Sequence, residues 1–317
     1  MKTLLDKVYL DFHETSLLDF DALLTSYGQD KYMAKSFSIF SYLVARGYKA
    51  STDLAEKFAE TMEAFFLATS IHDDVIDSRD DGEKALSQHS LNTRIVFGDY
   101  FFIQLAVHLA EITQELNAQY RKGFLDYFKR EMVVVAESQL IDQRMAGKPY
   151  TIEASLQQAE ERGGSWGRLV MGSVCRALGA PPPDVRFLSE AANDFFIALT
   201  ILDDLQDLTD DIANGIYSLA PSHYAERHGS LKLLQEARGS KEKIKRELDK
   251  TGSIKFSLET ASNYAAKANQ KLDEFLRNKE GMYWFQMKAF FNNVSLQLNN
   301  IGGGFFAQKG TPTQQRK

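Results

Sequence analysis

Apolar residues recur at intervals of three to four positions through almost all of this 317-residue chain, and this periodicity constrains the fold more than any other feature. Such spacing places apolar side chains on one face of an α-helix, whereas strands need strict alternation. The chain contains only six prolines, so few points interrupt a helix. We predict an all-α fold with helices over 32–46, 53–77, 93–117, 119–146, 153–179, 184–208, 254–278 and 281–300.

Short segments with turn-forming residues separate the predicted helices. Gly, Pro, Asn or Ser supplies the turn chemistry in RGYKAST, SRDDGEKALSQ, AGKPYT, GAPPPD and DDIANGIYSLAPSH. None of these segments is long enough to be an interdomain linker, and a composition of 44% hydrophobic residues can bury a substantial core. We therefore expect one domain over residues 1–305 and a flexible tail over 306–317.

The charge balance of the chain argues against one class of partner. The formal net charge is −6, whereas a nucleic-acid surface needs a basic face on which Lys and Arg predominate. A multiply charged cation suits an acidic chain better. The sequence therefore predicts no nucleic-acid partner.

Three features bear on the compartment in which the chain works. Cys175 is the only cysteine, so we expect no internal disulfide, a reducing environment and a packed small side chain. The start of the chain lacks the unbroken apolar stretch of a signal peptide. No run of about 18 apolar residues occurs. We therefore expect no membrane span and a cytoplasmic protein.

One short acidic pattern occurs twice in the sequence. It reads Asp-Asp-x-x-Asp, and its copies follow the apolar segments FFLATSIH and FFIALTIL. Residues four apart lie on one face of a helix, so each copy projects a pair of carboxylates from that face, and such like charges repel one another. Each cluster therefore needs positive charge beside it. The six residues are Asp73, Asp74, Asp77, Asp203, Asp204 and Asp207.

The two clusters have a plain interpretation and a functional one. A single acidic cluster is commonly a solvated helix end. Two clusters with identical spacing and equivalent apolar approaches favour a pair of metal sites that face each other across a helical bundle. Mg²⁺ prefers hard oxygen ligands and typically takes one or two carboxylates together with a substrate phosphate. We predict that the six aspartates bind Mg²⁺ and carry the catalytic chemistry.

An apolar, aromatic-lined cavity between two acidic rims suits a substrate with a diphosphate head and a hydrocarbon tail. Bound metal would neutralise the diphosphate and stabilise it as a leaving group, and its departure leaves an allylic carbocation. Aromatic ring faces can stabilise such a cation, although any one ring is more often plain core. The candidate rings are those of Phe65, Phe66, Phe195 and Phe196.

In these motifs the chain resembles the trans-isoprenyl diphosphate synthase superfamily, the class I isoprenoid synthases. SIHDDVID is similar to the first aspartate-rich motif of that family, FGDYFF to the segment after it, and LTILDDLQD to the second motif. The likeness covers residues 20–300. It implies a helical bundle around a central apolar cavity, three Mg²⁺ ions, an allylic prenyl diphosphate bound between the motifs, and frequently a homodimer.

The resemblance also implies several substrate-binding positions. Arg162 falls where the family has a lysine that contacts the allylic diphosphate. Gln139 and Asp142 fall where the family has polar residues beside the site. In chain-elongating relatives the wall before the first motif limits product length, and the small residues Ala68 and Thr69 here suggest room for a chain longer than C10.

Other positions depart from the chain-elongating members of the family. Those members bind a second substrate, isopentenyl diphosphate, through a Gly-Lys-Arg segment, a pair of arginines after the first motif and a nearby histidine. Here the first segment reads YGQDKYMAK, and Asp80 and Asp81 replace the arginine pair. The cations that remain nearby are Lys31, Lys35, Arg79 and His89.

Aspartates in place of arginines reverse the local charge. At ~4 Å a unit charge pair is worth on the order of 4 kcal/mol at an effective dielectric constant near 20, so a second diphosphate should bind poorly. Leu199-Thr200 also replaces the usual Phe-Gln before the second motif, which leaves Thr200 as a candidate beside the substrate. The favoured hypothesis is a terpene synthase that ionises a C15–C20 or longer diphosphate and cyclises or rearranges the cation.

Two other functions stay open. A chain-elongating prenyl diphosphate synthase would need other cations for the second diphosphate, and the candidates are Lys31, Lys35, Arg46 and Arg79. A regulatory subunit that pairs with an active synthase would have little reason to keep two intact metal clusters. Incubation of the protein with an allylic diphosphate, with and without isopentenyl diphosphate, separates the two enzyme hypotheses.

Overall fold

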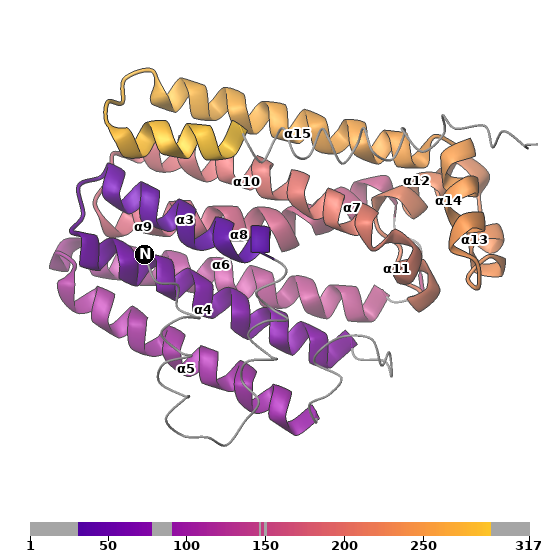
Figure 1. The fold of residues 1–317 in the computed structure, drawn as a ribbon, viewed down its shortest axis with the longest axis horizontal. Helices are drawn as coiled ribbons and strands as arrows, with labels where there is room; N and C mark the ends of the chain where they lie inside the picture. The colour runs from indigo at the N-terminus through magenta and orange to yellow at the C-terminus, as the bar shows by residue number, and fades with distance from the viewer. Residues whose placement is uncertain (1–30, 78–90, 146, 149–150, 293–317) are drawn as a thin grey trace, which may run out of the picture. The chain divides into compact units, whose positions relative to one another are not determined.

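The computed structural model describes residues 31–77, 91–145, 147–148 and 151–292 (Figure 1). Every regular element in these ranges is helical, which confirms the all-α prediction. The contacts between residues group into two compact units, which are described separately below. The single domain over residues 1–305 stays a prediction, and the predicted tail lies outside the described residues.

Within the described residues, the first unit comprises residues 31–77, 91–125, Ser173–Ala180 and Gly281–Trp284. Within it α4 packs against both α3 and α5, and the short α9 packs against α3 (Figure 1). Helix α4 begins after Ser51, whose Oγ accepts a hydrogen bond from the Leu54 N–H at 3.1 Å and so caps the helix. The bounds are α3 (Lys31–Gly47), α4 (Thr52–Asp77), α5 (Leu91–Glu115) and α9 (Ser173–Ala177).

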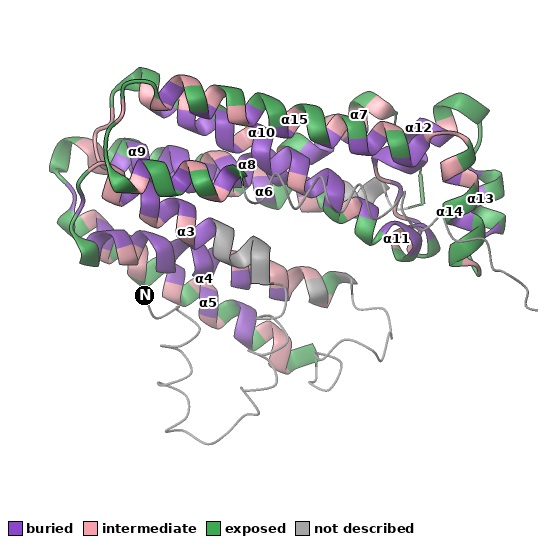
Figure 2. Cartoon of the chain, turned by 45° about the horizontal axis from the view of Figure 1, so that its top comes forward, coloured by how far each residue is buried: buried purple, intermediate pink, exposed green. Residues whose placement is uncertain are grey.

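Two long helices of similar length, α10 and α15, form the centre of the second unit, where they pack side by side (Figure 1). More than half of the residues of α10 are buried, as its purple ribbon shows in Figure 2. Helix α6 belongs to this unit from Asp126 onward. The long helices are α6 (Ala118–Met145), α10 (Pro182–Gln206) and α15 (Ser253–Leu276), and the shorter ones are α7 (Ile152–Ala159), α11 (Leu208–Asn214), α12 (Leu219–His228), α13 (Lys232–Glu236) and α14 (Lys241–Lys250).

The predicted helix over 153–179 is helical almost throughout but contains two π-helical turns. They are η2 (Glu160–Gly164) and η3 (Arg168–Gly172), with the short α8 (Ser165–Gly167) between them. At the end of η2 the Ser165 N–H donates to the Glu160 carbonyl, the five-residue spacing of a π turn. Apolar periodicity does not distinguish a π turn from an α turn, so the sequence did not predict them.

One predicted break is shorter than expected. The segment DDIANGIYSLAPSH, over 210–223, was predicted to be a turn region, but α11 continues to Asn214 and α12 starts at Leu219. Gly215, with φ of 80°, ends α11 in the left-handed conformation. Pro221 lies in the first turn of α12, where its missing N–H costs no helical hydrogen bond. The prediction of one long turn region was wrong here, because proline also fits the first turn of a helix.

Helix α5 has two apolar faces. Phe97, Phe101 and Leu105 are buried, whereas other large apolar side chains of the same helix are exposed: Val96, Ile103 and Val107. Among the described residues, this helix is long and apolar enough to cross a membrane, because its best window of 18 residues has a mean hydropathy of 1.4 and is only 28% buried. Core helices of soluble proteins pass the same test, so α5 is weak evidence against the predicted absence of a membrane span.

The remaining predicted elements agree with the structure where it describes them. The chain is helical again over 282–292, within the helix predicted for 281–300, and the rest of that range lies outside the described residues. Cys175 is buried and is not in a disulfide, as its predicted packing role requires.

Candidate functional site

The second aspartate cluster lies where α10 gives way to α11. Asp203 and Asp204 occupy the last turn of α10, and Asp207 follows its last residue. The Asp207 N–H donates to the Asp203 carbonyl at 3.0 Å, and the Asp207 carbonyl accepts from the Asp211 N–H at 2.9 Å. One helical turn therefore separates Asp207 from Asp211, and the junction adds a fourth carboxylate to the predicted three.

Asp211 is a site residue that the sequence reasoning missed. Its pKa is raised from 3.8 to about 8, first by burial and then by the negative charges of Asp204 and Asp207. The spacing of four residues after Asp207 favours a shared helix face, whereas the turn-forming residues of 210–223 favour a turn region that includes Asp211. The structure assigns it to a helix and places it among the other carboxylates.

Arg162 lies beside this cluster, as the sequence predicted for a diphosphate-binding cation. Its Nη2 donates to Asp204 Oδ1, and the two side chains are 29% and 15% exposed. Arg162 also lowers the pKa of Asp211, but the three aspartates raise it by more. The cluster therefore carries more negative charge than this guanidinium offsets.

The donor set of the second cluster fits a divalent cation. Carboxylate oxygens are the hard ligands that Mg²⁺ prefers, and the pKa of Asp211 is raised first by burial and then by the negative charges of Asp204 and Asp207, which a bound cation would offset. In the described part of the chain no three His, Cys, Asp or Glu side chains are already arranged as a metal site. Magnesium binding by Asp203, Asp204 and Asp207 stays a prediction.

The first aspartate cluster lies at the end of α4, which stops at Asp77. Asp73 is half-buried, whereas the side chains of Asp74 and Asp77 lie outside the described residues. Residues 78–90 also lie outside the described residues, and with them the predicted departures Arg79, Asp80, Asp81 and His89.

His72, immediately before this cluster, packs α4 against α5. Its ring stacks on Phe102 with 5.3 Å between the ring centroids, and its Nε2 lies 3.4 Å from Asp99 Oδ1. A Cβ atom at position 98 would lie 2.6 Å from the His72 ring, so Gly98 makes room for it. The geometry gives His72 a packing role between α4 and α5.

The predicted hydrocarbon-contacting residues of α4 are packed in the first unit. Phe65 and Ala68 are buried, and the Phe66 ring lies 4.9 Å from the Phe37 ring. The Thr69 hydroxyl donates to the Phe65 carbonyl at 3.0 Å. Their contact with a substrate tail stays a prediction.

The corresponding residues of α10 are packed in the second unit. The Phe195 ring lies 5.7 Å from that of Phe196 and 4.4 Å from that of Phe291. Thr200 is buried and lies against Gly163. On α6 Gln139 is half-buried, while the side chains of Asp142, and of Lys31 and Lys35 on α3, lie outside the described residues.

Arg46, a predicted alternative cation for a second diphosphate, is engaged within the first unit. Its Nη1 donates to the Ala50 carbonyl at 2.5 Å, and its Nη2 donates to the Tyr283 hydroxyl at 3.1 Å. The guanidinium also lies over the Tyr283 ring, 5.0 Å from its centroid. These contacts give Arg46 a structural role at the end of α3.

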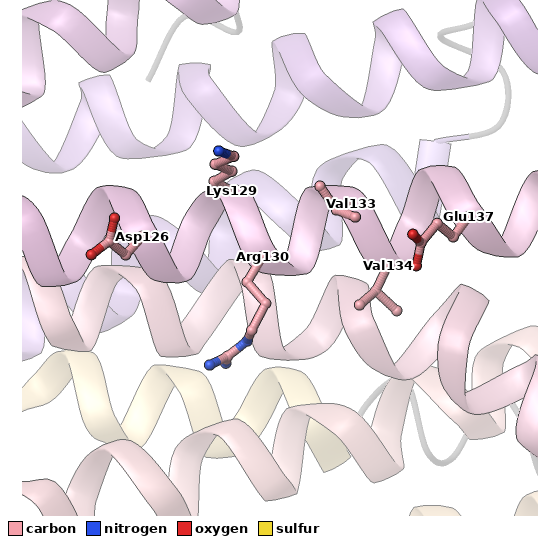
Figure 3. A pocket seen from close by; sticks show the side chains of 6 residues that line it. All are labelled: Asp126, Lys129, Arg130, Val133, Val134 and Glu137. Carbon is pink, nitrogen blue, oxygen red and sulfur yellow. The ribbon is translucent and has the colours of Figure 1, made fainter.

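A surface hollow of about 370 Å³ lies on α6 (Figure 3). Its lining residues all come from this helix, and none of the predicted site residues is among them. They are Asp126, Lys129, Arg130, Val133, Val134 and Glu137. The hollow is therefore not a candidate for the substrate site.

Comparisons with known proteins agree with this reading of the fold. The polyprenyl synthetase family model matches residues 29–217. The geranylgeranyl pyrophosphate synthetase of the archaeon Geoglobus acetivorans is 17% identical, with a TM-score of 0.71 and 93% of this chain and 96% of that chain covered. The geranylgeranyl pyrophosphate synthase of Lactobacillus brevis ATCC 367 is 18% identical, with a TM-score of 0.73 and the same coverage.

A polyprenyl synthase of Caulobacter crescentus CB15, complexed with calcium and isoprenyl diphosphate, is 16% identical with a TM-score of 0.70, and 92% of this chain and 96% of that chain are covered. A comparison with curated protein sequences finds no match. At these identities the solved structures show a shared fold, the all-α fold of isoprenoid synthases. The family model matches more than half of the sequence, and the chain therefore belongs to the polyprenyl synthetase family.

Proposed function

We propose that this chain is a prenyltransferase that condenses an allylic prenyl diphosphate with isopentenyl diphosphate. Membership of the polyprenyl synthetase family supports this function, and the similar solved structures are diphosphate synthases by name. This was the alternative hypothesis from the sequence, and the comparisons favour it over the terpene synthase. The product would be a longer trans-prenyl diphosphate.

One observation carries the proposal at the level of residues: a cluster of four carboxylates with Arg162 at its edge. Asp203, Asp204 and Asp207 would hold Mg²⁺, with Asp211 as a further acid beside them. Bound Mg²⁺ supplies charge neutralisation and makes the diphosphate a better leaving group.

The chain's own cation has a separate task. Arg162 would donate hydrogen bonds to the diphosphate oxygens, and these strengthen as negative charge accumulates on the leaving group. The buried rings of Phe195 and Phe196 would exclude water from the hydrocarbon end of the substrate. Asp73, Asp74 and Asp77 keep their predicted role as further magnesium ligands.

A terpene synthase is the second candidate function, and specific residues favour it. Asp80 and Asp81 stand where chain-elongating relatives have two arginines, and Leu199-Thr200 stands where they have Phe-Gln. Both changes would weaken the binding of a second diphosphate. In that case the allylic cation would react internally or with water.

The experiment that tests the function is an incubation of the purified protein with C10, C15 and C20 allylic diphosphates and Mg²⁺, with and without isopentenyl diphosphate. A longer diphosphate formed only with both substrates supports the prenyltransferase. A hydrocarbon or alcohol formed from the allylic substrate alone supports the terpene synthase. No turnover in either arm would contradict both.

We further propose that the protein works as a homodimer in the cytoplasm. The exposed apolar residues of α5 support this assembly, because Val96, Ile103 and Val107 recur at helical spacing on one face. A second copy would cover this face and bury the apolar area.

A further inference from the structure

The π-helical turn η2 approaches α10 so closely that its two glycines leave no room for side chains of their own beside those of α10. A Cβ atom at Gly163 would overlap the Thr200 hydroxyl and lie 2.7 Å from the Phe196 carbonyl. A Cβ atom at Gly164 would overlap Asn193 Oδ1. Glycine is therefore required at both positions for the present separation of η2 from α10.

The same face of α10 carries the partner of Arg162. Thr200 and Asp204 are four residues apart, one helical turn, so they lie on one side of α10. Gly163 contacts Thr200, while the residue before it, Arg162, donates to Asp204. The contact of the Gly163 backbone with Thr200 thus lies one helical turn from the ion pair between Arg162 and Asp204. It keeps the backbone of Arg162 close to α10, so that the guanidinium can reach Asp204.

An ion pair between Arg168 and Glu131 holds η3, the second π-helical turn, against α6. Arg168 Nε donates to Glu131 Oε2 at 2.8 Å, and Arg168 Nη1 donates to Asn193 Oδ1. Glu131 is only 3% exposed, so removal of either partner would leave an uncompensated charge in the interior. Asn193 and Thr200 are seven residues apart on α10, two helical turns, and they hold the glycine pair of η2 between them.

We propose that the contact between Gly163 and Thr200 is a positioning device that holds the Arg162 guanidinium at the second aspartate cluster, ready to bind a diphosphate. The inference rests on the proposed function, because it assumes that this cluster binds a magnesium diphosphate. It adds that Gly163 and Thr200 act on the diphosphate through the placement of Arg162.

The test is the affinity of the full-length protein for inorganic pyrophosphate with Mg²⁺, measured by isothermal titration calorimetry. Gly163→Ala should push η2 away from α10 and weaken binding about tenfold or more, because a misplaced charge-assisted donor loses its hydrogen bonds. With an allylic diphosphate the same variant should raise KM by a similar factor and lower kcat. Gly163→Ala/Thr200→Ala removes the overlapping hydroxyl but leaves the Phe196 carbonyl 2.7 Å from the added Cβ atom, so it should recover only part of the lost affinity.

Gly172→Ala is the matched control. A Cβ atom at this glycine would overlap the Tyr127 hydroxyl and lie 2.6 Å from Ser189 Oγ, a comparable crowding at the far end of the two π turns. It should lower the melting temperature without changing the affinity for pyrophosphate. Circular dichroism shows whether each variant is folded, and if Gly163→Ala is not, Thr200→Leu crowds the same contact from α10 and should also weaken binding.

The results separate the inference from the function on which it rests. Wild-type binding with unchanged affinity in folded Gly163→Ala or Thr200→Leu would overturn the positioning contact alone. Equal weakening in Gly172→Ala would also overturn it, because the effect would then be general to the segment. Absence of magnesium-dependent pyrophosphate binding and of turnover in the wild type would overturn the proposed function instead.

Discussion

At the scale of single residues, Arg162 and Asp211 matter most to the candidate site. The sequence predicted Arg162 because it occupies the position of a cation in a family motif, and the structure places it on Asp204. It did not predict Asp211, because the perturbation of this carboxyl arises from burial and from the sum of several charges. Such a sum depends on the fold and is not encoded in any one spacing.

Arg162→Ala should weaken the binding of magnesium pyrophosphate about tenfold or more, because a charge-assisted hydrogen bond to the diphosphate is lost. Arg162→Lys should retain part of the affinity, since it keeps the charge but not the paired donors. Calorimetry provides the measurement. Arg186→Ala, an exposed arginine near the start of α10, is the control and should bind as the wild type does. Unchanged affinity in Arg162→Ala would exclude the proposed contact.

Asp211→Asn should weaken Mg²⁺ activation. Burial and the neighbouring aspartates raise the pKa of Asp211 to about 8, and a cation bound at the cluster would favour its ionised form, which asparagine cannot supply. The magnesium concentration that gives half-maximal turnover should rise several-fold. Asp249→Asn, on α14, is the control. An identical magnesium dependence in wild type and Asp211→Asn would place Asp211 outside the metal site.

His223 gives the second unit a predicted pH dependence. Its pKa is lowered, first by burial and then by the charge of Arg227, and its Nδ1 lies 2.9 Å from Ser253 Oγ. Below pH 6.5 the unfolded state binds a proton that the folded state resists, so the free energy of unfolding should fall as the pH decreases through this range.

His223→Asn should flatten that fall, as measured by urea unfolding between pH 5 and pH 8. His228→Asn, an exposed histidine on the same helix, should leave the slope unchanged. A slope that persists in His223→Asn would assign the pH dependence to another group.

At the scale of helices, the sequence predicted most elements because apolar periodicity is a local property. The predicted ranges 53–77 and 184–208 lie within two residues of α4 and α10 at each end. The two π turns were missed, since their close approach to α10 depends on residues such as Thr200 that lie far along the chain. The glycines in ERGGSWG indicate a close approach between backbones, but they do not predict a π turn.

The ion pair between α6 and η3 is a contact whose loss should destabilise the second unit. Glu131 accepts from both Arg130 and Arg168, at 2.6 and 2.8 Å. Glu131→Gln should lower the free energy of unfolding by roughly 3 kcal/mol, because it leaves a partly buried guanidinium without its carboxylate. Urea denaturation measures the change. Glu137→Gln, exposed on the same helix, should cost little, and equal losses in the two variants would contradict this assignment.

At the scale of the whole molecule, paired motifs predicted the family and the fold, whereas the choice between two reactions depends on few residues. The substitutions at Asp80 and Asp81 are visible in the sequence, but their effect depends on the cations around them. The family comparison favours the prenyltransferase over the terpene synthase. Analysis of the products would distinguish the two reactions.

Ile103→Lys should shift the proposed dimer toward the monomer, because it places a charge in the exposed apolar face of α5. Size-exclusion chromatography with light scattering gives the mass of the species. Leu233→Lys, an exposed leucine on α13, is the control and should leave the mass unchanged. A wild-type protein that is monomeric at all concentrations would exclude the dimer.

The two π turns also bear on how this chain tolerates change over evolution. Each turn holds one residue more than an α turn needs, so each is a place where a single codon can be lost while the helix beyond it stays in phase. A deletion within 168–172 would spare the motif before it. A deletion of one residue within 160–164 would preserve the helix but turn the Arg162 guanidinium away from Asp204. A homologous protein could therefore lose the proposed activity through such a deletion and keep the fold.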